Sequence, residues 1–242
     1  MASEYLNWKY RDVQPDKPLV LTKEQRRKNW WNYHKWQVII GAVLFITTLS
    51  ILRYTLGIGI TKPDYQIGYV GSAPLPEDTV ASLETRLSKY GQDVNHDGKV
   101  MVKIKQYPTD ASEEGADAAA YAAASSMRLM GDLESRENCF FILDDVETFH
   151  LKYEVLADKD GNIAADRKDV ESYQWSSCPV LSAMDLGNYT EKVLGKNVTG
   201  SSDELLSTLY FARYGKNPDE KPTSAGEACE AFWKALTKGA KQ

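Results

Sequence analysis

Two acidic residues, Asp144 and Asp145, directly follow the apolar run from Cys139 to Leu143 (CFFIL). A short continuous apolar run is typical of a strand buried on both faces. In open α/β sheets ligands bind beyond the carboxyl ends of such strands, so both carboxylates are candidate ligand-binding residues. The alternative is a structural role, because an Asp in front of Val146 can cap a helix by accepting backbone N–H bonds.

Gly71 and Ser72 occupy the equivalent position after the β-prone run from Tyr65 to Val70 (YQIGYV). The residues that follow, from Pro74 to Asp78, suit the start of a helix. Backbone N–H groups at a helix N-terminus can receive an anion. Gly71 and Ser72 are therefore ligand-binding candidates on position alone.

The segment from Asp93 to Gly98 matches the first half of a calcium loop, with Asp93, Asn95 and Asp97 as the candidate ligands. The second half does not match, because Ile104 stands where a bidentate acidic residue should close the coordination shell. Asp and Asn also build plain turns through their own backbone hydrogen bonds. The sequence favours the turn and leaves Ca²⁺ as the only cofactor to consider.

Catalytic signatures are missing from the sequence, which has no HExxH, GxSxG, P-loop or GxGxxG pattern. We therefore predict no catalytic residues and favour a non-enzymatic protein. Cys139, Cys178 and Cys229 permit one disulfide in an oxidising space, and burial as small apolar side chains is the alternative.

The elements that must position these residues alternate between strand and helix from Tyr65 onward. We expect strands at residues 65–70, 99–107 and 139–143, a helix that ends at Gly91, and a second helix at 116–134. In the second helix a stripe of mostly small residues is expected to approach the sheet: Ala119, Ala123, Ser126, Met130 and Leu133. This βαβαβ order predicts an α/β domain with three layers and a mostly parallel sheet.

The rest of the chain, after the strand expected at residues 139–143, has fewer signals of secondary structure. Residues 175–181 are a candidate strand, and Asp158 to Asn162 form a strong turn signal. Capping boxes that open at Ser201 and Ser224 predict helices at residues 203–214 and 226–238.

A transmembrane helix is predicted at residues 38–60, where Arg53 is the only charged residue. The uninterrupted apolar stretch up to Leu52 would be only about 22 Å long as a helix, so the span needs the residues after Arg53 to cross a hydrocarbon core of about 30 Å. The long Arg53 side chain can reach the headgroups. The expected organisation is a basic and aromatic cytoplasmic segment at 1–37, the span at 38–60 and an extracytoplasmic domain at 64–242.

Orientation follows from the charges that flank the span, because cations concentrate on the cytoplasmic side. Only Lys62 follows the span closely, so the N-terminus is expected in the cytoplasm of a single-pass, uncleaved anchor in the cell membrane. Before the span, residues 22–36 are expected to form a helix that lies on the inner leaflet and contacts lipid. The predicted membrane-interface residues are Arg26, Arg27, Lys28, Trp30, Trp31, Tyr33, Lys35, Trp36 and Arg53.

Charge is distributed unevenly between these parts. Residues 1–60 contain nine Lys and Arg against four Asp and Glu, and the other 182 residues contain twenty against thirty. The resulting net charges are +5 and −10. An acidic domain without a basic stripe excludes nucleic acid as an expected partner.

Several segments resemble the first lobe of bacterial extracellular solute-binding proteins: YQIGYVGS, KYGQD, KVMVKIKQY, RLMGDLES and CFFILDD. The resemblance covers about residues 64–145 and implies one lobe of a Venus-flytrap fold that serves an uptake transporter. About 180 residues are too few for two full lobes, and the anchor is a helix rather than a lipidated cysteine. The layout with NWWNYHKW before the span also resembles single-pass membrane proteins of Gram-positive bacteria.

Three functional hypotheses follow. The first is a non-enzymatic, membrane-anchored extracytoplasmic binding or scaffold domain with a small-molecule ligand. The second is a subunit of a membrane complex for transport, secretion or envelope assembly, with a membrane-protein partner. The third is an anchored enzyme whose site lies near Asp144 and Asp145.

Overall fold

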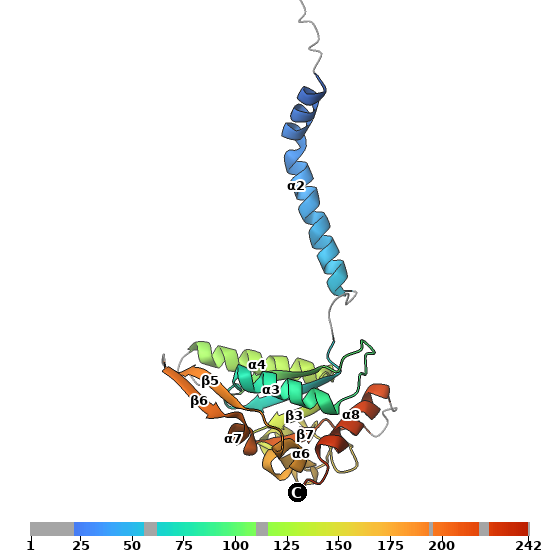
Figure 1. The fold of residues 1–242 in the computed structure, drawn as a ribbon. Helices are drawn as coiled ribbons and strands as arrows, with labels where there is room; N and C mark the ends of the chain where they lie inside the picture. The colour runs from blue at the N-terminus through green and yellow to red at the C-terminus, as the bar shows by residue number, and fades with distance from the viewer. Residues whose placement is uncertain (1–21, 56–61, 110–115, 194–195, 218–222, 242) are drawn as a thin grey trace, which may run out of the picture. The chain divides into compact units, whose positions relative to one another are not determined.

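The structure is a computed structural model that describes residues 22–55, 62–109, 116–193, 196–217 and 223–241. The chain divides between Thr61 and Lys62 into an N-terminal unit and a C-terminal unit (Figure 1). The N-terminal unit contains the helix α2 (Lys23–Thr55).

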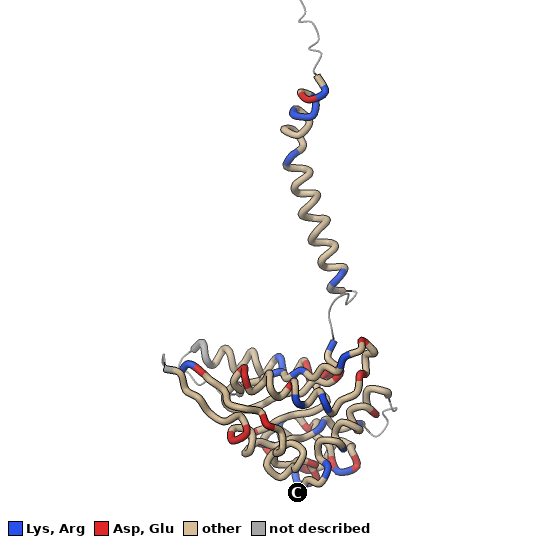
Figure 2. Tube along the Cα trace, in the orientation of Figure 1, with Lys and Arg blue, Asp and Glu red and all other residues tan. Residues whose placement is uncertain are grey.

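Helix α2 is continuous, so the helix expected before the span and the described part of the expected span form one helix. The helix continues through this region because no Gly or Pro interrupts the chain between Trp30 and Ile40. At 33 residues the helix is about 50 Å long, which exceeds a hydrocarbon core of about 30 Å. Figure 2 shows charged residues in its first turns, a further basic residue along its first half, an uncharged stretch after that residue and a basic residue near its end. The expected residues 56–60 of the span lie outside the described residues.

One helix among the described residues is thus long and apolar enough to cross a membrane. A signal sequence near an N-terminus passes the same test of length and composition.

The C-terminal unit is a mixed α/β domain. In chain order its elements are β1 (Tyr65–Gly71), α3 (Glu77–Leu87), η1 (Ser88–Tyr90), β2 (Val102–Pro108), α4 (Ala116–Glu134), β3 (Phe140–Leu143), α5 (Val146–Tyr153), η2 (Arg167–Asp169), β4 (Ser172–Gln174), η3 (Trp175–Ser177), α6 (Pro179–Ser182), β5 (Asn188–Val193), β6 (Lys196–Ser201), α7 (Ser202–Ser207), β7 (Tyr210–Arg213) and α8 (Ser224–Leu236). Five of these strands form the main sheet, and β5 pairs with β6 in a separate hairpin (Figure 1).

The main sheet has the strand order β2-β1-β3-β7-β4. Strand β1 pairs in parallel with β2 on one side and β3 on the other. Strand β7 is antiparallel to both of its neighbours, so within the described sheet it alone runs against the common direction. The expectation of a mostly parallel sheet therefore holds for the first three strands and needs correction at β7.

Helices cover both faces of the sheet, as the three-layer prediction requires. Two clusters of buried hydrophobic side chains lie in the domain, and successive residues of β3 alternate between them. Phe140 and Ile142 belong to the first cluster, and Phe141 and Leu143 belong to the second. Leucines of α3, α6 and α7 and aromatic residues of α8 complete the first cluster. Residues of α4 and α5, among them Leu129, complete the second.

Three expected elements differ from the structure. The candidate strand at residues 175–181 is helical, as η3 and α6, and the strand β4 lies just before it. The helix expected at 203–214 ends at Ser207, and its second half is the strand β7. The stripe predicted on α4 is confirmed at Leu133 and wrong at Ala119, Ala123 and Met130, which are exposed; the other buried positions are Ser125 and Leu129.

Candidate functional site

The carboxyl ends of β1 and β3 lie next to each other at one edge of the sheet. Val70 near the end of β1 is in register with Leu143 at the end of β3. The chain leaves β1 for β2 on one side and later adds β3 on the other, so the strand order reverses between β1 and β3. At such a reversal the loops that leave the two neighbouring strands diverge. Open α/β sheets bind ligands in the crevice between these loops.

The structure brings three of the sequence-predicted residues together at this edge. The backbone N–H of Ser72 donates a hydrogen bond to the carboxylate of Asp144, at 2.9 Å between Ser72 N and Asp144 Oδ2. Both residues are exposed, whereas Gly71 is buried at the end of β1. The Gly71 carbonyl accepts hydrogen bonds from the N–H and the hydroxyl of Thr109, at 2.8 and 3.1 Å. Loops after β1, β2 and β3 therefore meet here.

Asp145 does not join this group. It is the N-cap of α5 and accepts hydrogen bonds from the Thr148 hydroxyl at 2.6 Å and the Thr148 N–H at 3.0 Å. These bonds, that of the hydroxyl first, lower the pKa of the Asp145 carboxyl. The two adjacent carboxylates thus have different roles: Asp145 starts a helix, and Asp144 holds the loop after β1.

The loop from Ser72 to Pro76 is fixed by two side chains that the sequence reasoning missed. Gln106 of β2 accepts a hydrogen bond from the Leu75 N–H at 2.6 Å and donates one to the Leu75 carbonyl at 3.3 Å. The Tyr69 hydroxyl donates to the Ala73 carbonyl at 2.8 Å. Burial, reinforced by the charge of Asp144, raises the pKa of Tyr69 to about 12. The edge is therefore preformed, with a neutral tyrosine beneath it at ordinary pH.

A second feature is an open recess of about 460 Å³ between the start of α3 and the strand β5. It is lined by Glu77, Asp78, Thr190, Glu191 and Lys192. The Thr190 N–H donates to Asp78 Oδ2 at 3.2 Å, which attaches the hairpin to the first turn of α3. Three carboxylates against one ammonium make this recess acidic. It is therefore suited to a cationic group.

The candidate calcium loop is a turn held by its own side chains and by Asp64, whose carboxylate accepts from the Val94 and Asn95 N–H groups at 2.7 and 3.0 Å. The Asp93 carboxylate accepts hydrogen bonds from the backbone N–H groups of Asp97 at 3.2 Å and Gly98 at 2.8 Å. Asn95 Oδ1 also accepts from Asp97 N–H, and Asp97 Oδ1 accepts from Lys99 N–H. The three predicted ligands are thus brought together. Each of them holds the backbone of the turn, as the alternative interpretation expected.

No group of three or more His, Cys, Asp or Glu residues that could hold a metal ion occurs in the described parts of the chain. Ile104, at the position that should close the loop, is a buried core residue of β2. The position that should close the loop therefore supplies no oxygen ligand.

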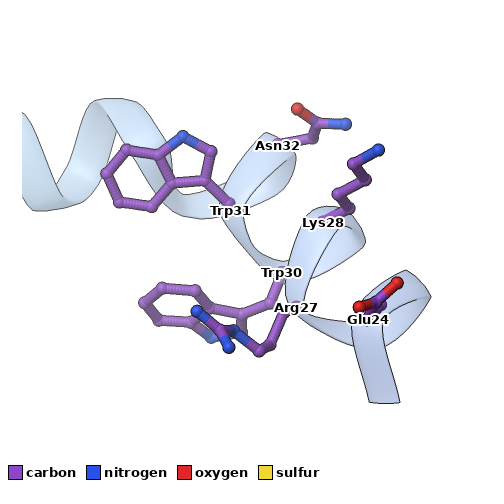
Figure 3. Close-up of a pocket in the computed structure, with 6 residues that line it drawn as sticks. All are labelled: Glu24, Arg27, Lys28, Trp30, Trp31 and Asn32. Atoms are coloured by element: carbon purple, nitrogen blue, oxygen red, sulfur yellow. The ribbon is translucent and has the colours of Figure 1, made fainter. Parts of the chain in front are cut away.

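The predicted membrane-interface residues all lie on α2, and the four aromatic ones are exposed by half or more. A shallow surface hollow of about 590 Å³ lies between side chains of the first turns. Its lining combines acidic, basic, aromatic and amide groups: Glu24, Arg27, Lys28, Trp30, Trp31 and Asn32 (Figure 3). Figure 3 shows the indoles of Trp30 and Trp31 on different sides of the helix ribbon, so the aromatic surface is not one narrow stripe.

Comparisons with known proteins give no family. No protein-family description matches the chain, and no solved structure matches it. Two curated proteins are similar to a part of the chain: the L-amino acid oxidase Cdc18 of Crotalus durissus cumanensis and the L-amino acid oxidase bordonein-L of Crotalus durissus terrificus. Each is 29% identical over 117 residues, 45% of this chain. The match spans about a fifth of each oxidase, 22% of its length.

Proposed function

We propose that this chain is a non-enzymatic, membrane-anchored binding or scaffold protein. Its α/β domain acts as a single lobe similar to one half of a solute-binding protein. Helix α2 anchors the chain in the cell membrane, with the basic N-terminal side in the cytoplasm and the domain outside. The single observation that carries the proposal is the junction of Ser72 and Asp144 at the point where the strand order reverses.

The binding role is supported by how this edge is built. Gln106 and Tyr69 fix the loop after β1, while the side chains of Ser72 and Asp144 stay exposed. Rigid backbone with exposed polar groups is what a binding edge requires, because little ordering is left for the ligand to impose. In two-lobed binding proteins closure around the ligand comes from a hinge between lobes. A single lobe presents its edge open, to a small molecule or to a partner protein.

The anchoring role is supported by the length of α2 and by its charges. Cationic residues lie in its first turns, and Arg53 lies in its last turn. Two hydroxyl groups within the apolar stretch are satisfied inside the helix, since Thr47 and Thr48 donate to carbonyls of the preceding turn. Such a helix is stable in lipid without a neighbouring helix to pair its polar groups.

A second candidate is a subunit of a membrane complex, favoured by the exposed aromatic residues around the start of α2. Tryptophan and tyrosine at a membrane boundary contact lipid headgroups, and they also fit against partner helices. An enzyme is supported less well. The Asp144 carboxylate accepts a hydrogen bond from the Ser72 backbone N–H, and the nearby Tyr69 hydroxyl donates to the Ala73 carbonyl. The pKa of Tyr69 is raised by burial and by the charge of Asp144, whereas an activated nucleophile needs a lowered pKa or an adjacent base.

Thermal unfolding of the full chain in detergent, with panels of amino acids, sugars and short peptides, tests the binding role. We expect at least one compound to raise Tm in the wild type and in Asp145→Ala, but not in Asp144→Ala. Asp145→Ala is the matched control, because it removes a neighbouring carboxylate that serves as a cap. Absence of any shift, or a shift that persists in Asp144→Ala, would contradict the proposed site.

A further inference from the structure

The sulfur atoms of Cys139 and Cys229 lie 2.7 Å apart, although 90 residues separate them in the chain. Cys139 directly precedes β3, and Cys229 lies on α8. Two unbonded sulfurs at this distance are in closer contact than ordinary packing gives, whereas a disulfide bond is about 2.05 Å long. A small decrease in the sulfur–sulfur distance would bring the pair to the length of a disulfide bond.

The surrounding fold holds both backbones in this position. The Cys139 N–H donates to the Gln66 carbonyl, and the Cys139 carbonyl accepts from the Tyr214 N–H, each at 3.0 Å. Cys139 is thus hydrogen-bonded to the main chain on both sides. Helix α8 is held by Phe232, whose ring stacks on Tyr65 with the centroids 4.4 Å apart. The proximity therefore follows from packed core elements and not from the chance position of a loop.

We propose that Cys139 and Cys229 form a disulfide that ties α8 to the central sheet when the domain meets a disulfide oxidant. Both residues are partly exposed, so an oxidant can reach them. Cys178 offers an internal contrast. It is fully buried, without a second cysteine recorded beside it, and burial raises the pKa of its thiol to about 11. We expect Cys178 to remain a thiol.

The chemistry is thiol–disulfide exchange. The S–H of Cys229 donates to the sulfur of Cys139 and lowers the pKa of the Cys139 thiol, so Cys139 is the attacking thiolate. It attacks the oxidant disulfide and releases one thiol. The Cys229 sulfur then attacks the mixed disulfide and releases the second thiol. Two thiols of the protein become one disulfide, and the oxidant carries away both electrons and both protons as two thiols.

The experiment counts thiols in the full chain in detergent after incubation with oxidised glutathione. The protein is denatured without reductant, alkylated and analysed by peptide mass. We expect one alkylated cysteine, Cys178, and a linked peptide that contains Cys139 and Cys229. Three alkylated cysteines, or glutathione left on Cys139 without a linked peptide, would overturn the proposal.

Variants sharpen this result. Cys178→Ser should leave no alkylated cysteine. Cys229→Ser should give no linked peptide that contains Cys139 or Cys178. A reductant should lower Tm by about 10 °C in the oxidised wild type and leave Tm of Cys229→Ser unchanged, because the bond closes a long loop. Equal Tm values for oxidised and reduced wild type would contradict a structural bond. If Cys229→Ser does not fold, the wild-type peptide analysis decides alone.

Alkylation inside living cells separates this inference from the proposed location. A linked peptide in cells supports both the pair and the extracytoplasmic placement. Free thiols in cells, together with a linked peptide after oxidation in vitro, uphold the pair and contradict the placement. Free thiols under both conditions overturn the pair.

Discussion

The guanidinium of Arg213 lies 2.7 Å from the carboxylate of Glu171, and both side chains are buried. A second carboxylate, that of Glu230 on α8, lies 2.6 Å from the same guanidinium. Arg213 also donates to the carbonyls of Asp158 and Lys159, each at 3.3 Å, and its guanidinium lies over the Trp233 ring. This one side chain therefore joins β7, the segment before β4 and helix α8.

Replacement of Arg213 is the first test of how the domain holds together. Arg213→Met should lower the free energy of unfolding by about 3–5 kcal/mol, because it leaves the buried carboxylate of Glu171 without its cationic partner. Lys234→Ala is the control, since the Lys234 side chain is exposed and its ion pair with Glu230 should contribute less than about 0.5 kcal/mol. Denaturant unfolding of both variants measures the difference. Equal effects would show that the buried network does not stabilise the domain.

The Asp145 cap gives a prediction of pH dependence. Its pKa is lowered in the folded state, so its stabilisation is complete above the unfolded pKa of about 3.9 and is lost as the pH falls through the folded value. Asp145→Asn keeps a capping side chain without the charge. Between pH 6 and 3, wild-type Tm should therefore fall more steeply than that of Asp145→Asn. Parallel pH profiles would rule out this role of the carboxylate.

Removal of the same cap has a separate, neutral-pH consequence. Asp145→Ala should lower the free energy of unfolding by about 1 kcal/mol, the usual effect of losing an Asp N-cap. Asp144→Ala should have a smaller effect, because it removes one exposed contact with a backbone N–H. Denaturant unfolding at pH 7 compares them, and a larger loss for Asp144→Ala would make Asp144 the structural residue of the pair.

Calcium should have little effect on the protein. The oxygens of Asp93, Asn95 and Asp97 accept backbone N–H bonds, and Ile104 supplies no ligand on the opposite side. Any binding should be millimolar or weaker, the range of the weakest loops of this type. Calorimetric titration measures it. A micromolar Kd that disappears in Asp93→Ala would show that another side chain completes the shell.

The first half of the domain could be predicted from the sequence because its patterns are local. Alternation and apolar runs marked β1, β2 and β3, and the rule for carboxyl strand ends selected Gly71, Ser72 and Asp144 before their contacts were known. The partners that fix this edge were missed, since Gln106 contacts Leu75 across 31 residues of chain. A glutamine in an alternating strand carries no local signal of such a contact.

The second half of the domain was harder to predict from the sequence for a physical reason. The capping box at Ser201 correctly marks the start of α7, where the Ser201 hydroxyl accepts the Glu204 N–H at 3.4 Å. No Gly or Pro then marks the end of the helix, and apolar residues continue to Phe211. The segment Tyr210–Arg213 becomes a strand because β3 and β4 offer it partners on both sides. Tertiary pairing of this kind overrides local propensity.

The topology of the anchored chain tests the central claim most directly. Protease is added to intact spheroplasts that produce the protein with a different epitope tag at each end, and lysed spheroplasts are the control for digestion of both ends. We expect the C-terminal tag and the domain from Lys62 onward to be lost, while the N-terminal tag and the basic segment before the span remain protected. Protection of the C-terminal domain with loss of the N-terminal tag would contradict the account.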